Sequence, residues 1–418
     1  MIKEKFCIKE KKTSLSVTNS QISAVLKSNI QKTGIRLYDD GCLGIAGAIG
    51  TYDENELTNN AKQMLKFKLP YEGTPTTDVN RSEDLSKELT ASNEEFVEFS
   101  EKVLATLREK HDDFAFNHKI ELVETETSLT NDVGTNLLQK EKYSLFILTI
   151  KNRESLSMFD GLGAVLSRDL DFDKVYNETS WICNVYNEKV DFSEENEKIP
   201  VVFLGSGEHA EFLMKFLTDM EGNTFGSGAS LFSGKIGEKL FSDNFSLIVD
   251  GNPNKKFSNF FDGEGTVLQN DRFALIENGV LKSPYTTKRI AKKYNYDLTG
   301  SASLGYDSTP AATAAGIAAL QSEKTLKELL GGRKAIYAVM AAGGDFTPQG
   351  EYASPIQAAY LFDGENYFGR LPQLAMSSNI YDMFGKDFIG ASSNGSYPGC
   401  PWSYLAIDMN VRKIDGWL

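Results

Sequence analysis

The stretch His209–Met220, HAEFLMKFLTDM, decides how the second half of this 418-residue chain is organised. Its apolar side chains recur at steps of one and four residues, and they are Phe212, Leu213, Phe216, Leu217 and Met220. This spacing is typical of a helix that buries one face against a core. Read alone, the segment predicts a buried helix and carries no chemistry.

The residues after this helix are more specific. Glu221–Thr224 reads EGNT, and Gly228–Glu238 reads GASLFSGKIGE. In this order they resemble the TldD/PmbA family, called modulators of DNA gyrase, whose active members carry His-Glu-x-x-x-His before a Glu-Gly pair and a Ser-Phe-Ser-Gly-like turn. Further stretches match the family in the expected order: Asp262–Gly265, Leu275–Leu281, Gly350–Ser354, Leu361–Glu365 and Ser377–Met383. Together these short motifs mark the chain as similar to that family.

The metal-binding positions of the family can be placed by counting back from Gly234 without gaps. The first His falls on Leu213, the Glu on Met214 and the second His on Thr218. Hydrolytic zinc needs imidazole or carboxylate ligands and a nearby general base, and these three side chains supply neither. The resemblance therefore implies the PmbA (TldE) branch, which lacks the metal motif. We expect no cofactor and no catalytic residue in this chain.

The resemblance also implies where the family's other functional positions lie. The third metal ligand, a cysteine in active members, would fall near Gly390 or Ala391, so Cys400 is interpreted as an unrelated packed thiol. Strands near Gly343–Gly350 and Leu361–Arg370 are candidates to hold an extended peptide by edge pairing. The family-motif positions that could line such a cleft are Glu221, Gly222, Ser233, Gly234, Glu264, Asn379 and Asp382.

Composition bounds the function classes. A formal net charge of -14 and a pI near 4.9 argue against binding nucleic acid through electrostatics alone. With 41% hydrophobic and 24% charged residues the chain is expected to be globular, and the sequence predicts neither a signal peptide nor a membrane span. The cysteines are widely spaced and suggest a reducing compartment, so we expect a cytoplasmic protein; they are Cys7, Cys42, Cys183 and Cys400.

The element pattern predicts an α+β fold, with an N-terminal mixed α/β domain over residues 1–195 and a mostly antiparallel, β-rich, barrel-like domain over 196–418. The boundary is placed in the charged, poorly periodic segment 187–199. Helices are expected over Glu54–Phe67, Ser92–Lys110, 171–185, Thr286–Tyr294, Thr325–Leu330 and Ile380–Phe384. Strands are expected over Ser14–Val17, Ile22–Val25, Gly34–Tyr38, Cys42–Ala48, Phe114–Thr127, Tyr143–Asn152, Phe245–Val249, Arg272–Glu277, Val280–Ser283, Lys334–Ala341, Gln357–Phe362, Asn366–Phe368 and Tyr404–Val411.

Two nucleotide-binding alternatives were weighed against this interpretation. Val201–Ala210, VVFLGSGEHA, could form the strand, glycine turn and helix of a dinucleotide site. A Rossmann unit then needs a second parallel strand ending in an acid about 20 residues later, whereas Gly222–Gly228 is a glycine-rich loop. Gly228–Lys235 fails as a phosphate loop because it has one residue too many and is followed by Ile236.

Other candidate catalytic groups have simpler structural explanations. His111, His118 and His209 have no partner at i+4 and no neighbouring cysteine cluster, so each is interpreted as a surface or core histidine. Asp262 and Glu264 could form an acid pair, but a turn held by side-chain oxygens is the simpler role.

The sequence thus favours a PmbA/TldE-like subunit without metal that helps a zinc-bearing, TldD-like paralogue to cut peptides. Its expected partners are that paralogue, in a heterodimer, and an unfolded peptide, with neither membrane nor direct nucleic-acid binding. The alternative is a homodimeric peptide-binding or scaffold protein with no peptidase role.

Overall fold

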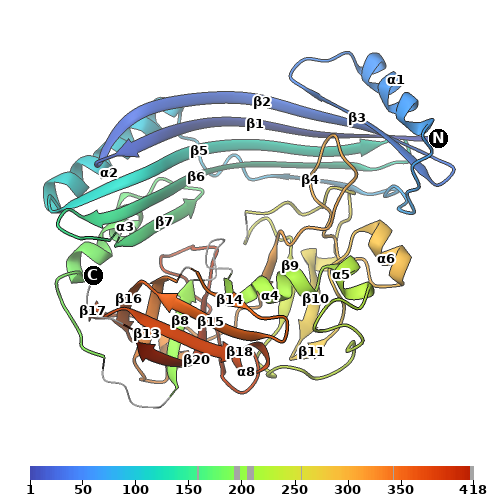
Figure 1. Ribbon diagram of the computed structural model, residues 1–418. Coiled ribbons are helices and arrows are strands. Elements are labelled where there is room, and N and C mark those ends of the chain that lie inside the picture. Colours follow the sequence, from blue (N-terminus) through green and yellow to red (C-terminus); the bar gives the residue numbers. More distant parts are fainter. Residues whose placement is uncertain (158–159, 193–197, 205–210, 256, 342, 415–418) are drawn as a thin grey trace.

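The computed structural model describes residues 1–157, 160–192, 198–204, 211–255, 257–341 and 343–414. A long curved sheet, built from residues 2–167, arches over two smaller sheets from the rest of the chain (Figure 1). Short helices are few compared with the strands, and most neighbouring strands are antiparallel. The predicted α+β fold with a β-rich, mostly antiparallel second half is confirmed.

The long sheet has the order β3-β2-β1-β5-β6-β4, with β7 also beside β6. Its strands are β1 (Ile2–Thr18), β2 (Gln21–Asp39), β3 (Cys42–Ile49), β4 (Asn80–Asp84), β5 (Phe114–Asn131), β6 (Asn136–Asn152) and β7 (Gly161–Ser167). Only β4 and β6 pair in parallel. The turn from β1 to β2 is a two-residue loop in which Asn19 and Ser20 have φ of 49° and 61°, a conformation that matches the twist of the flanking strands.

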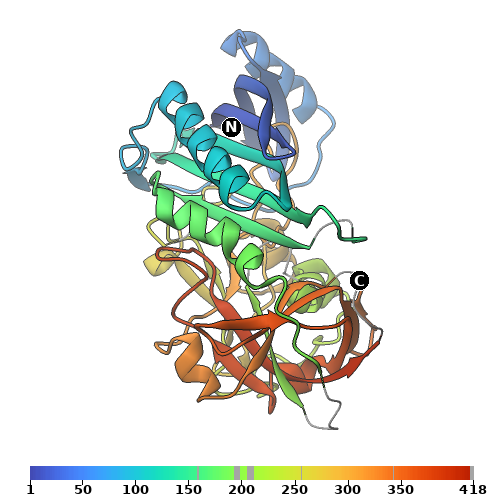
Figure 2. The ribbon, with the colours of Figure 1, turned by 90° about the vertical axis from the view of Figure 1, so that its left-hand side faces the viewer.

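Three helices accompany the long sheet, and the sequence predicted all three. They are α1 (Glu54–Leu65), α2 (Asn93–Lys110) and α3 (Phe172–Val185). Each helix begins after a side chain that accepts hydrogen bonds from free backbone N–H groups, and these caps are Asp53, Ser92 and Asp171. α2 and α3 contact each other beside the sheet (Figure 2).

The predicted strands of the long sheet were too short, and β4 and β7 were missed. β1 begins at Ile2 and not at Ser14, β2 continues through residues 26–33, and β4 lies inside the segment 70–92 that was predicted as a polar loop. Most of the missed residues are polar and stay at least partly exposed. Such strands lose the alternation of apolar and polar residues on which the prediction rests.

The second half contains a nine-stranded and a four-stranded sheet. The nine-stranded sheet has the order β14-β15-β18-β20-β8-β13-β16-β17, with β19 also beside β20. Its strands are β8 (Ile199–Leu204), β13 (Ala335–Met340), β14 (Asp345–Phe346), β15 (Glu351–Ile356), β16 (Ala358–Phe362), β17 (Tyr367–Arg370), β18 (Leu374–Asn379), β19 (Phe388–Ala391) and β20 (Tyr404–Lys413). The four-stranded sheet, ordered β11-β10-β9-β12, consists of β9 (Leu247–Asp250), β10 (Arg272–Glu277), β11 (Val280–Leu281) and β12 (Ile317–Ala319).

Short helices connect these strands: α4 (Glu211–Asp219), α5 (Gly222–Gly226), the 3-10 helix η2 (Gln269–Asp271), α6 (Lys288–Tyr294), α7 (Leu326–Leu330) and α8 (Ile380–Met383). The two halves of the chain share buried side chains. One core cluster contains Phe146 and Val165 of the long sheet together with Val202 and Tyr404 of the nine-stranded sheet. The proposed division at residue 195 stays a prediction.

At the α3 end of the long sheet, the halves meet through aromatic rings, which we call the aromatic junction: Trp181, Tyr337, Tyr360, Phe362 and Tyr367. The ring centroid of Trp181 lies 4.0 Å from that of Tyr367 and 5.0 Å from that of Tyr360. Tyr337 packs 5.7 Å from both Trp181 and Phe362. Aromatic rings bury large areas with defined geometry, so these contacts hold α3 against the nine-stranded sheet.

Near the chain's N-terminus the halves meet through buried polar groups, which we call the charged junction: Glu4, Arg36, Tyr38, Tyr71, Glu264 and Lys288. Arg36 is fully buried and pairs with Glu4 at 3.3 Å. Its guanidinium also donates to the backbone oxygens of Gly263 and Gly305. A side chain of the long sheet therefore satisfies carbonyl groups of the second half, which fixes how the two parts meet.

Candidate functional site

The helix α4 occupies the segment where the sequence predicted a buried helix. Leu213 is 7% exposed and belongs to the core cluster of the second half. Phe212 packs against Phe203 of β8 and Tyr352 of β15, with ring centroids 3.7 Å and 5.2 Å apart. Phe216 contacts four further phenylalanine rings. The predicted helix is confirmed, and Leu213, the position of the family's first histidine, lies within the apolar core.

The other two predicted motif positions on α4, Met214 for the glutamate and Thr218 for the second histidine, do not converge with Leu213 on a polar site. Met214 is 44% exposed. The hydroxyl of Thr218 donates to the carbonyl oxygen of Met214 at 2.9 Å, one helical turn back. The described residues contain no group of three or more His, Cys, Asp or Glu side chains that could hold a metal ion. His209 lies outside the described residues, and the absence of a metal stays a prediction.

The Glu-Gly pair of the family motif, Glu221 and Gly222, stabilises the backbone just after α4. Glu221 caps α5, its Oε2 accepting the backbone N–H of Thr224 at 2.9 Å. A Cβ at Gly222 would collide with Ile290, so glycine permits the close approach of α5 to α6.

The Ser-Phe-Ser-Gly-like turn is held in the same way. The hydroxyl of Ser233 donates to the carbonyl oxygen of Phe225 at 2.7 Å. Gly234 has a φ of +78°, the left-handed region that favours glycine. Of these predicted positions, Glu221 and Ser233 stabilise the turns that follow α4 through hydrogen bonds to the backbone.

A hollow of about 670 Å³ lies at the β14 edge of the nine-stranded sheet. It is lined by Asp345, Thr347, Glu351, Tyr352, Ala353, Ser377, Ser378, Asn379, Asp382 and Asn410. Two predicted positions, Asn379 and Asp382, therefore meet residues of the predicted cleft segment Gly343–Gly350. Asn379 donates to Glu351 at 2.8 Å and caps α8, while Asp382 pairs with Lys386 at 3.0 Å.

β14 ends its sheet and pairs with β15 on one side. In the part of the chain that the structure describes, no strand pairs with its other side. β14 is two residues long, and the backbone N–H of Phe346 donates to Oδ1 of Asp345 at 2.7 Å. The opposite edge differs. The backbone of Arg370 in β17 exchanges hydrogen bonds with Glu188 and Val190, which cover that end of the predicted segment Leu361–Arg370.

Glu264, the remaining predicted position, is buried in the charged junction. It accepts hydrogen bonds from the hydroxyl of Tyr71 and the backbone N–H of Lys288. Burial, reinforced by the neighbouring Asp262, raises the pKa of Glu264 to about 7. Asp262 accepts the backbone N–H groups of Glu264 and Thr266, which is the turn geometry considered from the sequence.

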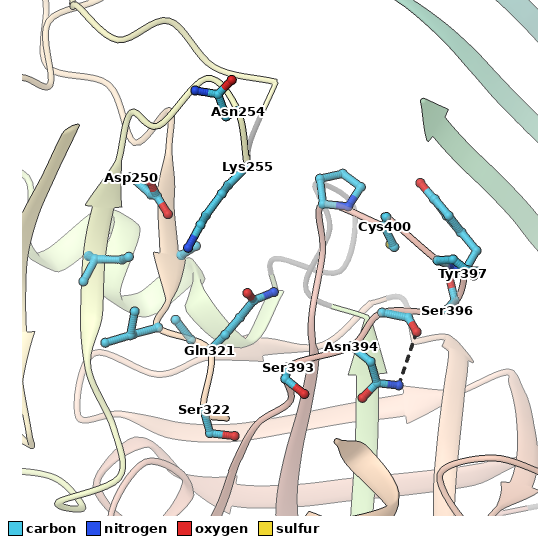
Figure 3. A pocket seen from close by; sticks show the side chains of 18 of the residues that line it. Asp250, Asn254, Lys255, Gln321, Ser322, Ser393, Asn394, Ser396, Tyr397 and Cys400 are labelled. Carbon is cyan, nitrogen blue, oxygen red and sulfur yellow. Dashed lines mark hydrogen bonds between the residues drawn. The ribbon is translucent and has the colours of Figure 1, made fainter. Parts of the chain in front are cut away.

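A larger hollow, about 800 Å³, lies beside the four-stranded sheet (Figure 3). Its charged lining residues are Asp250, Lys255 and Arg272, and none of them belongs to a predicted site. They are contributed by separate strands and a loop, so no local motif contains all three. The turn sequence Asn252–Lys255 was the only local sign of an irregular, polar wall.

The sequence and the fold both resemble those of known proteins. The sequence profile described as the PmbA/TldA metallopeptidase C-terminal domain matches residues 196–402. TldE from Thermococcus kodakarensis superposes with a TM-score of 0.80 at 19% identity, over 99% of this chain and 97% of that one. The chain belongs to the TldD/PmbA family.

Other members share the fold or part of the sequence. A candidate modulator of a DNA gyrase from Thermotoga maritima superposes with a TM-score of 0.79 at 14% identity, covering 98% of this chain and 96% of that one. An uncharacterized protein of Methanocaldococcus jannaschii is 30% identical over 159 residues, which span 37% of this chain and 36% of that protein. No helix among the described residues is long and apolar enough to cross a membrane.

Proposed function

We propose that this TldD/PmbA family member is the non-metal subunit of a TldD-type metallopeptidase and takes part in peptide proteolysis or maturation. The observation that carries the proposal is the composition of α4, where Leu213, Met214 and Thr218 stand at the positions predicted for the family's first histidine, glutamate and second histidine. In this assembly the zinc, its activated water and the general base belong to the paralogue. This chain contributes binding and assembly.

The β14 edge supports a peptide-binding role. A strand without a neighbour on one side can add an extended peptide as a further strand, and β14, two residues long, offers a short edge of this kind. The hollow next to β14 offers room for the peptide's side chains, with the polar groups of Ser377, Asn379 and Asp382 on its wall. Extended, unfolded segments are the substrates that such an edge accepts.

The outer edge of β2 supports a role as a subunit. Over Gln21–Gln31, β2 pairs with β1, and no described strand pairs with its other edge. Val25, Leu26 and Ile30 are exposed along this length, Leu26 by 63%. An unpaired strand with exposed apolar side chains is a site for association with another chain. We assign this edge to the TldD-like paralogue.

The direct test uses the purified chain with and without a paralogue that carries His-Glu-x-x-x-His. We expect the isolated chain to contain no stoichiometric zinc by elemental analysis and to cleave no unfolded peptide, whereas the pair forms a complex and cleaves it. Zinc together with activity in the isolated chain would overturn the proposal. A stable homodimer that binds peptide and ignores every paralogue would favour the alternative, a peptide-binding scaffold without a peptidase role.

Two variants locate the surfaces. Ser377→Trp fills the hollow beside β14 and should weaken peptide binding by the pair about tenfold, while Ser82→Trp on the exposed strand β4 should leave it unchanged. Leu26→Asp should weaken the complex, and the matched control Leu156→Asp alters a leucine that is 92% exposed elsewhere. Equal effects of a variant and its control would remove the assignment of that surface.

A further inference from the structure

The hollow of about 800 Å³ has two facing walls (Figure 3). One wall comes from the four-stranded sheet and its loops, with Asp250 at the end of β9, Arg272 at the start of β10, and residues 318–322 in and just after β12. The other wall is the loop 393–401 between β19 and β20. The volume lies in the range of small-molecule sites, about 300–1,000 Å³.

The charge on this lining is opposite to that of the whole chain. Two cations, Lys255 and Arg272, face one anion, Asp250, so the lining carries one excess positive charge in a protein of net charge -14. Nη2 of Arg272 contacts the carboxylate of Asp250 at 3.2 Å. Arg272 and Asp250 thus neutralise each other, and the charge of Lys255 remains.

Two nitrogen groups of this wall have no partner in the described part of the chain. The ammonium of Lys255 forms no ion pair or hydrogen bond with the described residues, and Figure 3 shows its side chain extending between Asp250 and Gln321. Nε of Arg272 is a buried atom without a hydrogen-bond acceptor among those residues. Nε has almost no accessible surface, so a ligand in the hollow would meet the Arg272 guanidinium at its other nitrogens; the Arg272 side chain as a whole is 36% exposed.

The facing wall is polar and held in place. The backbone N–H of Ser393 donates to the carbonyl oxygen of Lys324 at 2.8 Å, and the hydroxyl of Tyr397 contacts Leu166 of β7. Ser396 donates its hydroxyl to the buried Glu178 of α3 at 2.8 Å, which leaves the Ser396 oxygen as an acceptor. Apolar side chains complete the lining: Ile248, Leu320, Pro398 and Pro401.

We propose that this hollow binds a small organic anion, with a carboxylate or phosphate group held by Lys255 and by the exposed part of the Arg272 guanidinium. The anion gains charge-assisted hydrogen bonds from both cations, and the apolar lining accommodates the uncharged body of the molecule. A cation is a poor fit because Asp250, the single acid of the lining, is already paired. The site is separate from the β14 edge, and it does not depend on the proposed peptidase role.

Calorimetric titration of the full chain tests the proposal with three probes: inorganic phosphate, N-acetylphenylalanine, and the neutral N-acetylphenylalanine amide. The acid and the amide share shape and apolar body and differ in charge. We expect the acid to bind about tenfold more tightly than the amide, the gain that one charge-assisted hydrogen bond provides at least. If phosphate competes with the acid, both use the same anion position; if phosphate alone binds, the natural ligand is a phosphate ester.

Substitutions of Lys255 and Arg272 test whether these two residues bind the anion. Lys255→Gln should abolish the preference for the acid, or weaken phosphate binding about tenfold, while the exposed Lys62→Gln on α1 removes an equal charge and should change neither. Arg272→Lys keeps the charge but loses the planar guanidinium, and should weaken anion binding while thermal unfolding shows the fold intact. Equal binding of acid and amide with no phosphate binding, equal loss in both lysine variants, or no binding of phosphate or acid below about 10 mM would each overturn the proposal.

Discussion

The two ends of the long sheet join the second half of the chain by different chemistry (Figure 1). In the charged junction, Arg36 is fully buried, and its two terminal nitrogens donate to Glu4 and to two carbonyl oxygens across the interface. In the aromatic junction, Trp181 of α3 packs against Tyr360 and Tyr367. Apolar contact tolerates small shifts, whereas a buried guanidinium is stable only when its acceptors are in place. The charged junction therefore sets the register between the halves, and the aromatic junction supplies buried area.

Among the substitutions considered, one that breaks the charged junction should lower the free energy of unfolding the most. Arg36→Met leaves Glu4 without its cation and two carbonyl groups without their donor, so unfolding free energy should fall by about 3–5 kcal/mol. Urea denaturation followed by circular dichroism measures the change. The double variant Glu4→Leu/Arg36→Met removes both charges and should recover part of the loss. If the double variant is less stable than Arg36→Met, an unpaired buried charge is not the cause.

Trp181→Ala should have the next largest effect. The substitution removes a partly buried indole that contacts three tyrosine rings, and we expect a loss of about 3 kcal/mol. Trp181→Phe keeps an aromatic ring and should lose less than half as much. The same urea measurement applies. A loss that depends strongly on salt would contradict an apolar origin, because burial of rings is not screened.

The sequence predicted the helices better than the junctions for physical reasons. α2 carries a capping side chain, Ser92, and a repeating apolar face, both of which are local. The helix α4 was predicted in the same way. In the charged junction, Arg36 and Glu264 lie 228 residues apart, and each is flanked by ordinary strand or turn residues. Sequence periodicity indicates local elements and does not predict polar contacts between distant residues. For this reason neither the charged junction nor the 800 Å³ hollow was predicted.

Among the candidate site residues, the family-motif positions lie in different surroundings, and their functional role stays a prediction. Asn379 and Asp382 were predicted as motif positions near a cleft, and the structure places both on the hollow at the β14 edge. Glu264 was predicted from the same kind of motif but is 1% exposed, with its carboxylate bonded to Tyr71 and Lys288. A short motif identifies a turn, and the long-range packing decides which surface the turn faces.

The third prediction concerns pH dependence beside the aromatic junction. Glu178 is buried next to Tyr337 and Tyr404 and receives one hydrogen bond, from Ser396; burial raises its pKa to about 8. The folded state therefore retains a proton that the unfolded state releases near pH 4.5. Stability from this group is complete below that pH and is lost as pH rises toward 8.

Glu178→Gln replaces the carboxyl with a neutral group of the same shape. The variant should match the wild type near pH 4.5 and be more stable by about 2 kcal/mol at pH 8, where the wild type must bury a charge. Urea midpoints measured at both pH values give the difference. A variant whose stability has the wild-type slope between these pH values would show that Glu178 is not the titrating group.

The smallest effect on stability is expected from the exposed ion pairs of β1. They can be compared directly with the charged junction, because β1 supplies both a buried ion pair and ion pairs near the surface. Glu4 points into the charged junction, while its neighbours Lys3 and Lys5 pair with Glu54 of α1 at 2.7 Å near the surface. These lysines lower the pKa of Glu54 to about 2. The depressed pKa means that its stabilisation is present above about pH 4.5 and is lost as pH falls toward 2.

Glu54 remains largely exposed, so solvent screens the pair and Glu54→Gln should cost less than about 1 kcal/mol at pH 7, and less still in high salt. The measurement is the urea midpoint at low and high salt beside that of Arg36→Met. A cost for Glu54→Gln equal to that of Arg36→Met would mean that charge pairing on β1 stabilises the fold irrespective of burial. A small, salt-sensitive cost beside a large, salt-insensitive one would assign the effect of Arg36 to its burial between the two halves of the chain.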